Sequence, residues 1–345
     1  MIDAGFSPSA ARVIAASLSG REIRVVSGDQ CSCWRRVDRG VGLGGRLGPV
    51  FYTLTANRYP SVLFGGCRCH LLADDATVEL ATILEELLAA VQLLQSNLDA
   101  VQDWSSGVWL VMNPMKIVFV CFGSASSVAT ARALEPFVEV AGRRIVLSAE
   151  VKYLGVCLTE TLSWGRQARM LTSRVYNALR SMAHFKRALS PRVRLLLVRS
   201  LAAVHLDYCD LVFSGADART THMLQVAQNA SIRFIDSLPW GSHVSASRRR
   251  LGFLTATDKR RYKSLILFHR LIHDGRPSAL VDTIRPLSGD DFRRGRATGT
   301  RRYVLPRACT GYGSMSFSFR TVRDWNSLPD GLRGITTLPA FKRAL

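Results

Sequence analysis

Residues 69–78 read Cys-His-Leu-Leu-Ala-Asp-Asp-Ala-Thr-Val, with two adjacent acids between apolar flanks. Short runs rich in apolar and β-branched residues on both sides of a polar pair are typical of a β-hairpin. The pattern therefore predicts two paired strands with Asp74 and Asp75 at or beside the turn. This hairpin is the strongest local signal in the chain, and the other elements are placed around it.

A long amphipathic helix is predicted directly after the hairpin. Apolar residues between Leu84 and Val101 recur at three- and four-residue spacing and form one stripe. Further short elements are expected on both sides of it: helices at 10–18 and 50–57, strands at 22–26 and 116–122, and two strand-like runs within 144–156.

The pattern becomes helical from about residue 164. Strand signals are few between 164 and 234, and Pro191 stands near one expected helix start. A further helical stretch at 262–272 lies among clusters of basic residues. The order of these elements predicts a sheet-containing amino-terminal part and a helical, basic carboxy-terminal half.

The charge of the chain favours a polyanionic partner. Its 46 Lys and Arg residues exceed its 26 Asp and Glu residues by 20, and the pI is about 10.4. Each neutralised phosphate of a nucleic acid releases condensed counterions, so such an excess favours nucleic-acid binding. Most of the basic residues are arginine, whose fork of N–H donors can grip phosphate at two points. General basicity without a specific partner is the alternative.

Several classes are disfavoured by the composition. The first 18 residues lack a basic start followed by an apolar core, and no apolar run reaches the roughly 18 residues that a membrane span needs. Eight cysteines in 345 residues do not suggest a disulfide scaffold, so we expect an intracellular, reducing location. The pairs Cys31/Cys33 and Cys67/Cys69 are spaced too closely for a usual zinc knuckle, and buried thiols are expected instead.

Asp74 and Asp75 are the only acidic pair with a catalytic appearance. Two carboxylates on a hairpin suit Mg²⁺, which prefers oxygen ligands and keeps several waters. Paired metal ions in phosphoryl transfer stabilise both the attacking and the leaving oxygen. Adjacent acids also occur by chance, and a solvated turn is the competing interpretation.

A set of motifs in order along the chain carries a resemblance to a known family. The segment Leu72–Asp75 resembles the aromatic-Ala-Asp-Asp catalytic hairpin of reverse transcriptases, with leucine where an aromatic residue is usual. Other segments are similar to elements of the non-LTR retrotransposon (LINE/jockey-type) enzymes: the Gly-rich stretch 39–49, Asn-Pro-Met-Lys at 113–116, Lys-Tyr-Leu-Gly-Val at 152–156, and tail elements at 224–234 and 325–329.

This resemblance implies a fold. The chain is expected to be α+β, with a partial reverse-transcriptase palm, an antiparallel sheet with packed helices, at residues 1–147. An α-helical thumb-like domain would follow at 148–240, and a basic helical tail at 241–345. In the tail, Trp325 and Leu328 are expected to pack at a helix end and take no part in chemistry.

The resemblance also implies site residues and ligands. Asp74 and Asp75 would be catalytic and would hold Mg²⁺ and the incoming deoxynucleoside triphosphate. Gly44, Arg46 and Lys116 would lie against the template or substrate. The implied partners are an RNA template and a DNA primer, with no membrane.

Three departures from the family pattern qualify this expectation. The family has another metal-binding Asp on a strand ahead of the helix expected here at 10–18, and the chain begins at Met1. Leu43 stands where Gln is usual. Arg58 stands where the helix expected at 50–57 normally ends in Asp. We therefore expect weak Mg²⁺ binding, no polymerisation by this polypeptide alone, and poor stability of residues 1–147 alone because strand edges would be exposed.

Two alternatives remain open at this point. The chain could be a non-catalytic remnant that grips RNA or DNA through its basic thumb and tail. It could also be a structural or regulatory protein whose charge is incidental. A steep fall of nucleic-acid affinity with salt, unaffected by either acid, would favour the first alternative.

Overall fold

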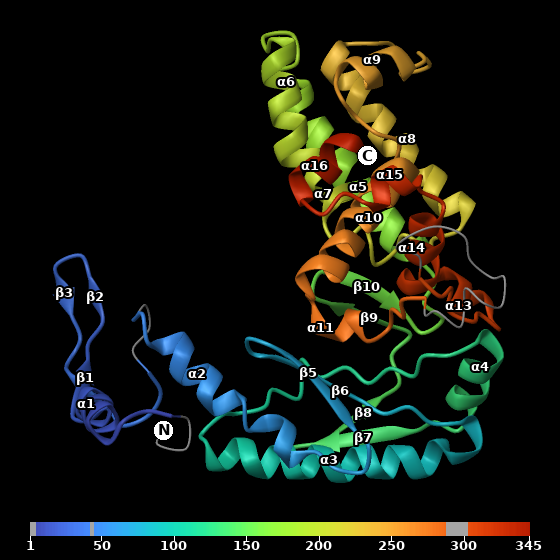
Figure 1. Cartoon of the computed structure of the whole chain (residues 1–345). Helices are drawn as coiled ribbons and strands as arrows, with labels where there is room; N and C mark the ends of the chain where they lie inside the picture. Colours follow the sequence, from blue (N-terminus) through green and yellow to red (C-terminus); the bar gives the residue numbers. More distant parts are fainter. Residues whose placement is uncertain (1–4, 42–44, 288–302) are drawn as a thin grey trace. The chain divides into compact units, whose positions relative to one another are not determined.

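A computed structural model describes residues 5–41, 45–287 and 303–345 (Figure 1). The chain divides into two compact units, Met1–Val151 (unit 1) and Lys152–Leu345 (unit 2). Gly44, one of the predicted template-binding residues, lies outside the described residues.

Unit 1 begins with a helix and two small ladders. Helix α1 (Pro8–Leu18) starts at Ser7, whose side chain accepts a hydrogen bond from the N–H of Ala10, so the predicted helix is confirmed. Strand β1 (Arg21–Ile23) pairs with β4 (Arg35–Val37), and β2 (Val26–Ser27) pairs with β3 (Gln30–Cys31). The single strand predicted at 22–26 is therefore wrong, because the chain leaves one ladder at Ile23 and enters the next at Val26.

The predicted acidic hairpin is confirmed. Helix α2 (Gly48–Ala56), which matches the prediction for 50–57, and the 3₁₀ helix η2 (Tyr59–Val62) precede it. Strand β5 (Arg68–Leu72) then pairs antiparallel with β6 (Asp75–Glu79).

Unit 1 has its main core around the predicted amphipathic helix. A 3₁₀ turn η3 (Leu84–Glu86) leads into α3 (Leu87–Gly107), and α4 (Ala125–Ala133) precedes the hairpin of β7 (Phe137–Val140) and β8 (Arg143–Val146). The buried members of this core are Leu87, Val91, Ala131, Val138, Val140 and Ile145.

The strand predicted at 116–122 is wrong. In this stretch only Phe119 forms a bridge, with Leu147, and no ladder develops. Ile117, Phe119 and Cys121 nevertheless pack against the α3 core. The apolar run that suggested a strand is therefore an extended segment that packs on the core without a strand partner.

The Lys-Tyr-Leu-Gly-Val motif at 152–156 forms a turn between two strands. Strand β9 (Glu150–Tyr153) pairs with β10 (Val156–Thr159) across Leu154 and Gly155, whose φ angles are 45° and 82°. The Tyr208 hydroxyl donates to the Leu154 carbonyl at 2.8 Å. A Cβ atom on Gly155 would lie 3.1 Å from the Tyr208 ring, so both the turn and the close ring favour glycine here.

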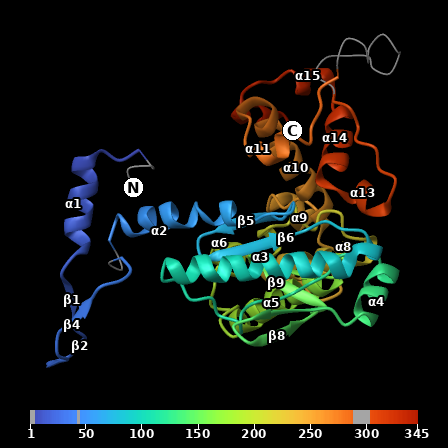
Figure 2. The same cartoon turned by 90° about the horizontal axis from the view of Figure 1, so that it is seen from below.

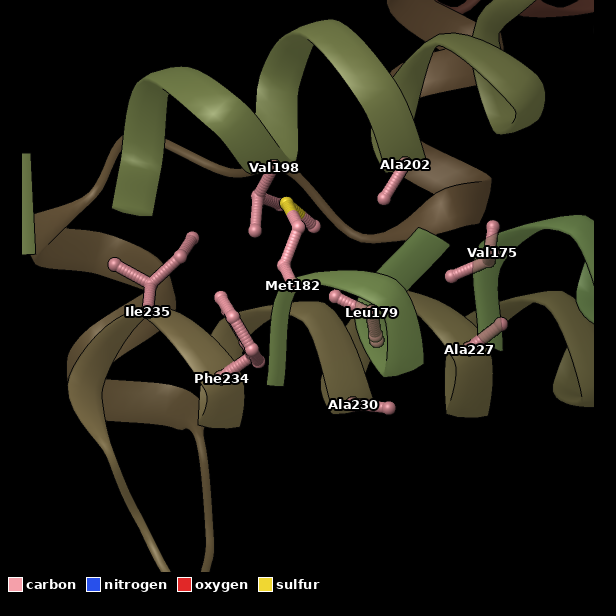
Figure 3. Packing of buried hydrophobic residues seen from close by; sticks show 9 residues of the cluster. All are labelled: Val175, Leu179, Met182, Val198, Ala202, Ala227, Ala230, Phe234 and Ile235. Carbon is pink, nitrogen blue, oxygen red and sulfur yellow. The ribbon is translucent and has the colours of Figure 1, made fainter. Parts of the chain in front are cut away.

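Unit 2 is helical, as predicted, and its first core joins three helical segments (Figure 3). Helix α5 (Gly165–Ala183) packs against the run α6 (Pro191–Leu197), η4 (Val198–Ala203) and α7 (Val204–Asp207), and against α8 (Ala218–Asp236). Pro191 begins α6, as expected. The buried side chains in Figure 3 come from α5, η4 and α8 and include Val175, Val198 and Ile235, each 0% exposed.

A second core of unit 2 lies in the carboxy-terminal region. After α9 (Ser245–Arg250), helix α10 (Ala256–Asp274) packs against α14 (Phe317–Asn326) and α16 (Leu338–Ala344). Phe268, Trp325 and Phe341 are each 0% exposed in this core, and Leu328 is buried beside them. The expectation that Trp325 and Leu328 pack is confirmed. Short helices α11 (Ser278–Val281), α13 (Gly311–Met315) and α15 (Asp330–Arg333) complete the described region.

The prediction of an α+β fold is confirmed at the level of class. Helices dominate the described residues, and their strands pair as five two-stranded ladders, β1–β4, β2–β3, β5–β6, β7–β8 and β9–β10. The predicted domain limits at 147/148 and 240/241 stay predictions. Among the helices in the described ranges, none is long and apolar enough to cross a membrane.

Candidate active site

The candidate site is the tip of the β5–β6 hairpin. The strand register pairs Leu72 with Asp75, so Ala73 and Asp74 form a two-residue turn. Of these two, only Ala73 has a positive φ, 52°, as at the first central position of a type II′ turn. Glycine is usual there, and a non-glycine residue costs on the order of 1–3 kcal/mol. The hairpin therefore holds its acids on a strained turn.

Both acids are open to solvent. Asp74 and Asp75 are exposed, and Leu72 beside them is 56% exposed. Within the described part of the chain, neither carboxylate has a side-chain hydrogen bond or an ion pair. Two adjacent negative charges without a cationic partner repel each other, so a cation from outside would relieve them.

Helix α2 places a phenol close to the hairpin tip. The pKa of Tyr52 is raised, mainly by burial and then by the negative charge of Asp74. The helix that follows the Gly-rich stretch thus approaches the acids. The sequence predicted this helix but carried no signal that Tyr52 would lie near Asp74.

Helix α3 holds the segment that leads into the hairpin (Figures 1 and 2). The ring of Tyr59, in η2, packs edge-on against Trp104 of α3 with centroids 5.6 Å apart. Burial, followed by the nearby Cys69 thiol, raises the pKa of Tyr59 to about 12. The aromatic contact fixes the start of the connection between α2 and β5.

A second anchor lies five residues further along the connection. The buried Asn97 side chain of α3 accepts a hydrogen bond from the N–H of Phe64 at 2.9 Å. Its amide donates to the carbonyl of Leu93 at 2.9 Å. Gly65 passes so close to α3 that a Cβ atom would lie 2.7 Å from Leu93. The entry to β5 is therefore set by α3, which acts as the platform of the site.

The other predicted site residues lie on separate segments. Arg46 is exposed just ahead of α2. Lys116 is exposed in a turn, where its N–H donates to the Asn113 carbonyl at 3.0 Å. The Asn113 side chain accepts from the N–H of Met115 at 3.0 Å, so the Asn-Pro-Met-Lys motif is a capped turn. No hydrogen bond or ion pair between described residues joins Lys116 to Asp74 or Asp75.

The donor set at the hairpin fits Mg²⁺ only in part. Among the described residues, no group of three or more His, Cys, Asp or Glu side chains could hold a metal ion. Two carboxylates can still bind Mg²⁺ together with water and substrate phosphates, which is the usual arrangement in phosphoryl-transfer sites.

The expectation of buried thiols is wrong for Cys31 and Cys33, which are exposed. Burial raises the pKa of Cys67 and Cys69, which are half-buried.

Comparisons with known proteins point to one class, the RNA-directed DNA polymerases of mobile elements. The chain is 27% identical over 248 residues to the "RNA-directed DNA polymerase from mobile element jockey" of Drosophila melanogaster, covering 68% of this chain and 26% of that protein. It is 25% identical over 263 residues to the "Probable RNA-directed DNA polymerase from transposon BS" of the same species, covering 72% of this chain and 28% of that protein. The Drosophila funebris jockey polymerase is 25% identical over 243 residues, covering 68% and 26%.

These matches confirm the resemblance to jockey-type reverse transcriptases of non-LTR retrotransposons. The chain spans about a quarter of the length of the curated relatives it matches. No family model matches the chain, and no solved structure gives a significant match.

Proposed function

We propose that this chain is part of an RNA-directed DNA polymerase and supplies two carboxylates of its active site. The similarity to three mobile-element polymerases supports this proposal. Residues 1–147 would then be part of the polymerase palm, residues 148–240 the thumb-like domain and residues 241–345 the basic tail. The division of the chain at Val151 lies close to the first of these limits.

The exposed pair of acids at the tip of the β5–β6 hairpin is the observation that carries the proposal. Asp74 and Asp75 would hold Mg²⁺ and, through it, the phosphates of a deoxynucleoside triphosphate. The metal would supply stabilisation of the charge that develops on the transferring phosphate. The strained turn at Ala73 and the anchors on α3 keep the acids in place.

Three other residues are proposed to face the substrates. Gly44 and Arg46 belong to the Gly-rich segment that leads into α2, and α2 carries Tyr52 close to Asp74. Lys116 projects from a capped turn and would neutralise phosphate charge. The substrates would be an RNA template, a DNA primer and deoxynucleoside triphosphates, in keeping with the activity in the names of the relatives.

Binding of Mn²⁺, used as a paramagnetic substitute for Mg²⁺, tests the proposal directly. We expect weak binding to the full chain that becomes stronger when a deoxynucleoside triphosphate is added, because its phosphates complete the coordination shell. Asp74→Asn or Asp75→Asn should each weaken this binding about tenfold, or about 1.4 kcal/mol. Electron paramagnetic resonance of free and bound Mn²⁺ measures the effect.

Asp103→Asn is the matched control. Asp103 is an exposed acid on α3 in the same unit, so its replacement removes the same charge without touching the hairpin. Equal losses in all three variants would mean that Mn²⁺ binds by general charge alone, and the proposed site would be wrong.

A nucleotide-incorporation assay tests the completeness of the site. We expect no template-dependent incorporation by the purified 345-residue chain, because no third acidic ligand joins Asp74 and Asp75 among the described residues to hold a second metal ion. Incorporation that disappears in Asp74→Asn would contradict this expectation while supporting the role of the acids.

A further inference from the structure

Unit 2 contains a cleft lined by arginines of helices α10 and α14. These two helices pack against each other (Figure 1). The cleft has a volume of ≈ 510 Å³. Its basic side chains are Arg260 and Arg261 of α10 and Arg320 and Arg323 of α14. Several hydroxyl groups complete the lining, among them those of Ser214, Thr257 and Thr321.

The cleft carries an excess of positive charge. Four guanidinium groups line it, and the only acid among its lining residues is Asp324. Asp324 lies 4.0 Å from Arg261 and 3.3 Å from Arg323, so one carboxylate is shared between two arginines. Among the ion pairs of the described residues, none joins this carboxylate to Arg260 or Arg320. The pKa of Arg320 is lowered, first by burial and also by Arg323, while the charge of Asp324 acts in the opposite direction. Arg320 acts unfavourably on the charge of Arg260, and Arg323 on that of Arg320, so a multivalent anion in the cleft would offset the repulsion.

Arg260, one of the lining residues, has an unsatisfied donor. Its side chain is only 6% exposed, and one terminal nitrogen, Nη1, has no hydrogen-bond partner among the described residues. Its pKa is lowered, first by burial and also by Arg320, while Asp210 on its other side acts in the opposite direction. Asp210 is itself held by Lys263 at 2.9 Å. A buried charged donor without a partner costs several kcal/mol, so the site favours a ligand that can accept from it.

A second unsatisfied group lies on the opposite wall. Thr321 of α14 is 1% exposed, and its hydroxyl finds no hydrogen-bond partner in the described part of the chain. Arg320 beside it is held in place, since it donates to the Met315 carbonyl at 3.1 Å and to the backbone and hydroxyl oxygens of Ser214. The cleft therefore presents fixed donors from both helices before any ligand arrives.

We propose that this cleft binds the phosphate groups of a nucleic-acid backbone. Planar guanidinium groups match the oxygens of phosphate, and hydroxyl groups add neutral donors that are common at phosphates. Contacts of this kind position a strand without reading its bases. The inference rests on the proposed function only for the nature of the ligand, because the cleft lies in unit 2 and shares no residue with the hairpin.

The test compares two charge-matched double variants of the full chain. Arg261→Gln with Arg323→Gln removes two cleft cations that are 51% and 60% exposed. Arg187→Gln with Arg249→Gln removes two exposed cations of unit 2 that do not line the cleft. Fluorescence anisotropy with a labelled single-stranded RNA of about 20 nucleotides, at several salt concentrations, gives the affinity and its salt dependence.

The cleft variant should bind the RNA about tenfold more weakly at roughly 0.1 M salt. Its slope of log affinity against log salt should fall by about 1.4, since each lost phosphate contact on a single strand contributes about 0.7. The control variant should change by less than about threefold. Equal losses in the two variants, or no loss in either, would overturn the inference.

Two further experiments complete the test. The first separates the loss of charge from a loss of folding, and the second separates binding of RNA from binding of free phosphate. Arg261→Lys with Arg323→Lys keeps the charge and should retain most of the affinity, so it decides the matter if the Gln variant fails to fold, as judged by thermal unfolding. Inorganic pyrophosphate, titrated by calorimetry, checks the source of the phosphate. Cleft-dependent pyrophosphate binding with unchanged RNA binding would overturn the assignment to a nucleic-acid backbone.

The outcome is independent of the catalytic proposal. Asp74→Asn and Asp75→Asn should leave the cleft-dependent RNA affinity within about threefold of the unaltered chain. Suppose that Mn²⁺ binding is equally weakened in the Asp74, Asp75 and Asp103 variants while RNA binding still depends on the cleft. That result would contradict the proposed active site and support this inference.

Discussion

The two units of the chain bury their apolar residues in different ways. In unit 2, helices from distant parts of the sequence share three buried apolar clusters, and Phe268, Trp325 and Phe341 are fully buried. Unit 1 has one main cluster around α3 and leaves large side chains in solvent, including Trp109 at 63% and Val111 at 94% exposure. The unit that carries the candidate chemistry is thus the less self-sufficient of the two.

The small ladders of unit 1 also indicate that this unit is less stable by itself. Each of β1–β4, β2–β3, β5–β6 and β7–β8 has only two strands, and independent stability usually requires three or more strands or packing against a helix. Of these ladders, β7–β8 meets the second condition because it packs on α3. The unpaired edges and exposed apolar side chains are surfaces that other chains can adhere to. Our prediction that residues 1–147 alone are poorly stable and prone to aggregation stays to be tested.

Trp325→Ala should cause the largest loss of stability, because it would disrupt the carboxy-terminal core of unit 2. The ring is 0% exposed and contacts Phe268 and Phe341, with centroids 5.1 and 5.5 Å away. Truncating a buried aromatic side chain to alanine costs about 3–5 kcal/mol. Hydrogen exchange should show lost protection in α10 and α14, while α3 in unit 1 keeps its protection.

Trp109→Ala provides the matched control for that substitution. Trp109 is exposed and contacts Arg39, whose guanidinium lies 3.3 Å from the ring centroid. Loss of an exposed cation–π contact costs about 0.5–1 kcal/mol. Similar losses for the two tryptophans would show that burial of aromatic side chains does not separate the two units.

A pH titration should produce a smaller change that is confined to unit 1. The pKa of Tyr59 is raised to about 12 by burial and by Cys69, above the ordinary value of 10.0. A raised pKa means that the folded state favours the neutral phenol, so its contribution is complete below about pH 10. That contribution is lost as the pH rises from about 10 to about 12, by about 1–2 kcal/mol.

Tyr59→Phe isolates this contribution. The variant keeps the aromatic contact with Trp104 but cannot ionise. Denaturant unfolding at about pH 9 and about pH 12 should show a smaller loss in Tyr59→Phe than in the unaltered chain. The same loss in both proteins would mean that Tyr59 does not titrate between these values.

The elements that the sequence predicted well are those with strong local signals. The apolar stripe between Leu84 and Val101 predicted α3, and the acids between apolar flanks predicted the β5–β6 hairpin. The strand predicted at 116–122 was wrong because this apolar run packs on the core around α3. A local pattern cannot show that a strand partner is lacking.

The features of the two sites that the sequence did not predict depend on contacts between segments far apart in the sequence. Tyr52 of α2 lies near Asp74, and the connection between α2 and β5 is anchored on α3, which is distant in the sequence. The arginine cleft joins residues that lie far apart in the sequence, Arg260 and Arg320. The sequence showed a basic cluster at 259–261, but it did not show that a second pair of arginines would face it.

Ala73→Gly should give the smallest effect, and its sign is opposite to that of the others. Ala73 has a φ of 52°, which glycine adopts without strain. The hairpin should therefore gain about 0.5–1 kcal/mol, after allowing for the greater backbone entropy of unfolded glycine. Hydrogen exchange of the β5–β6 amides measures this local change.

Ala76→Gly is the control on the same hairpin. Ala76 lies in β6 opposite Leu71, where glycine should weaken the strand. A loss of protection at both positions would show that the turn at Ala73 is unstrained. Ala73→Gly could also increase stability and weaken Mn²⁺ binding at the same time. This result would indicate that the strained turn holds Asp74 and Asp75 in the arrangement that binds the metal. Relaxing the backbone between the strands would then move the two carboxylates out of that arrangement.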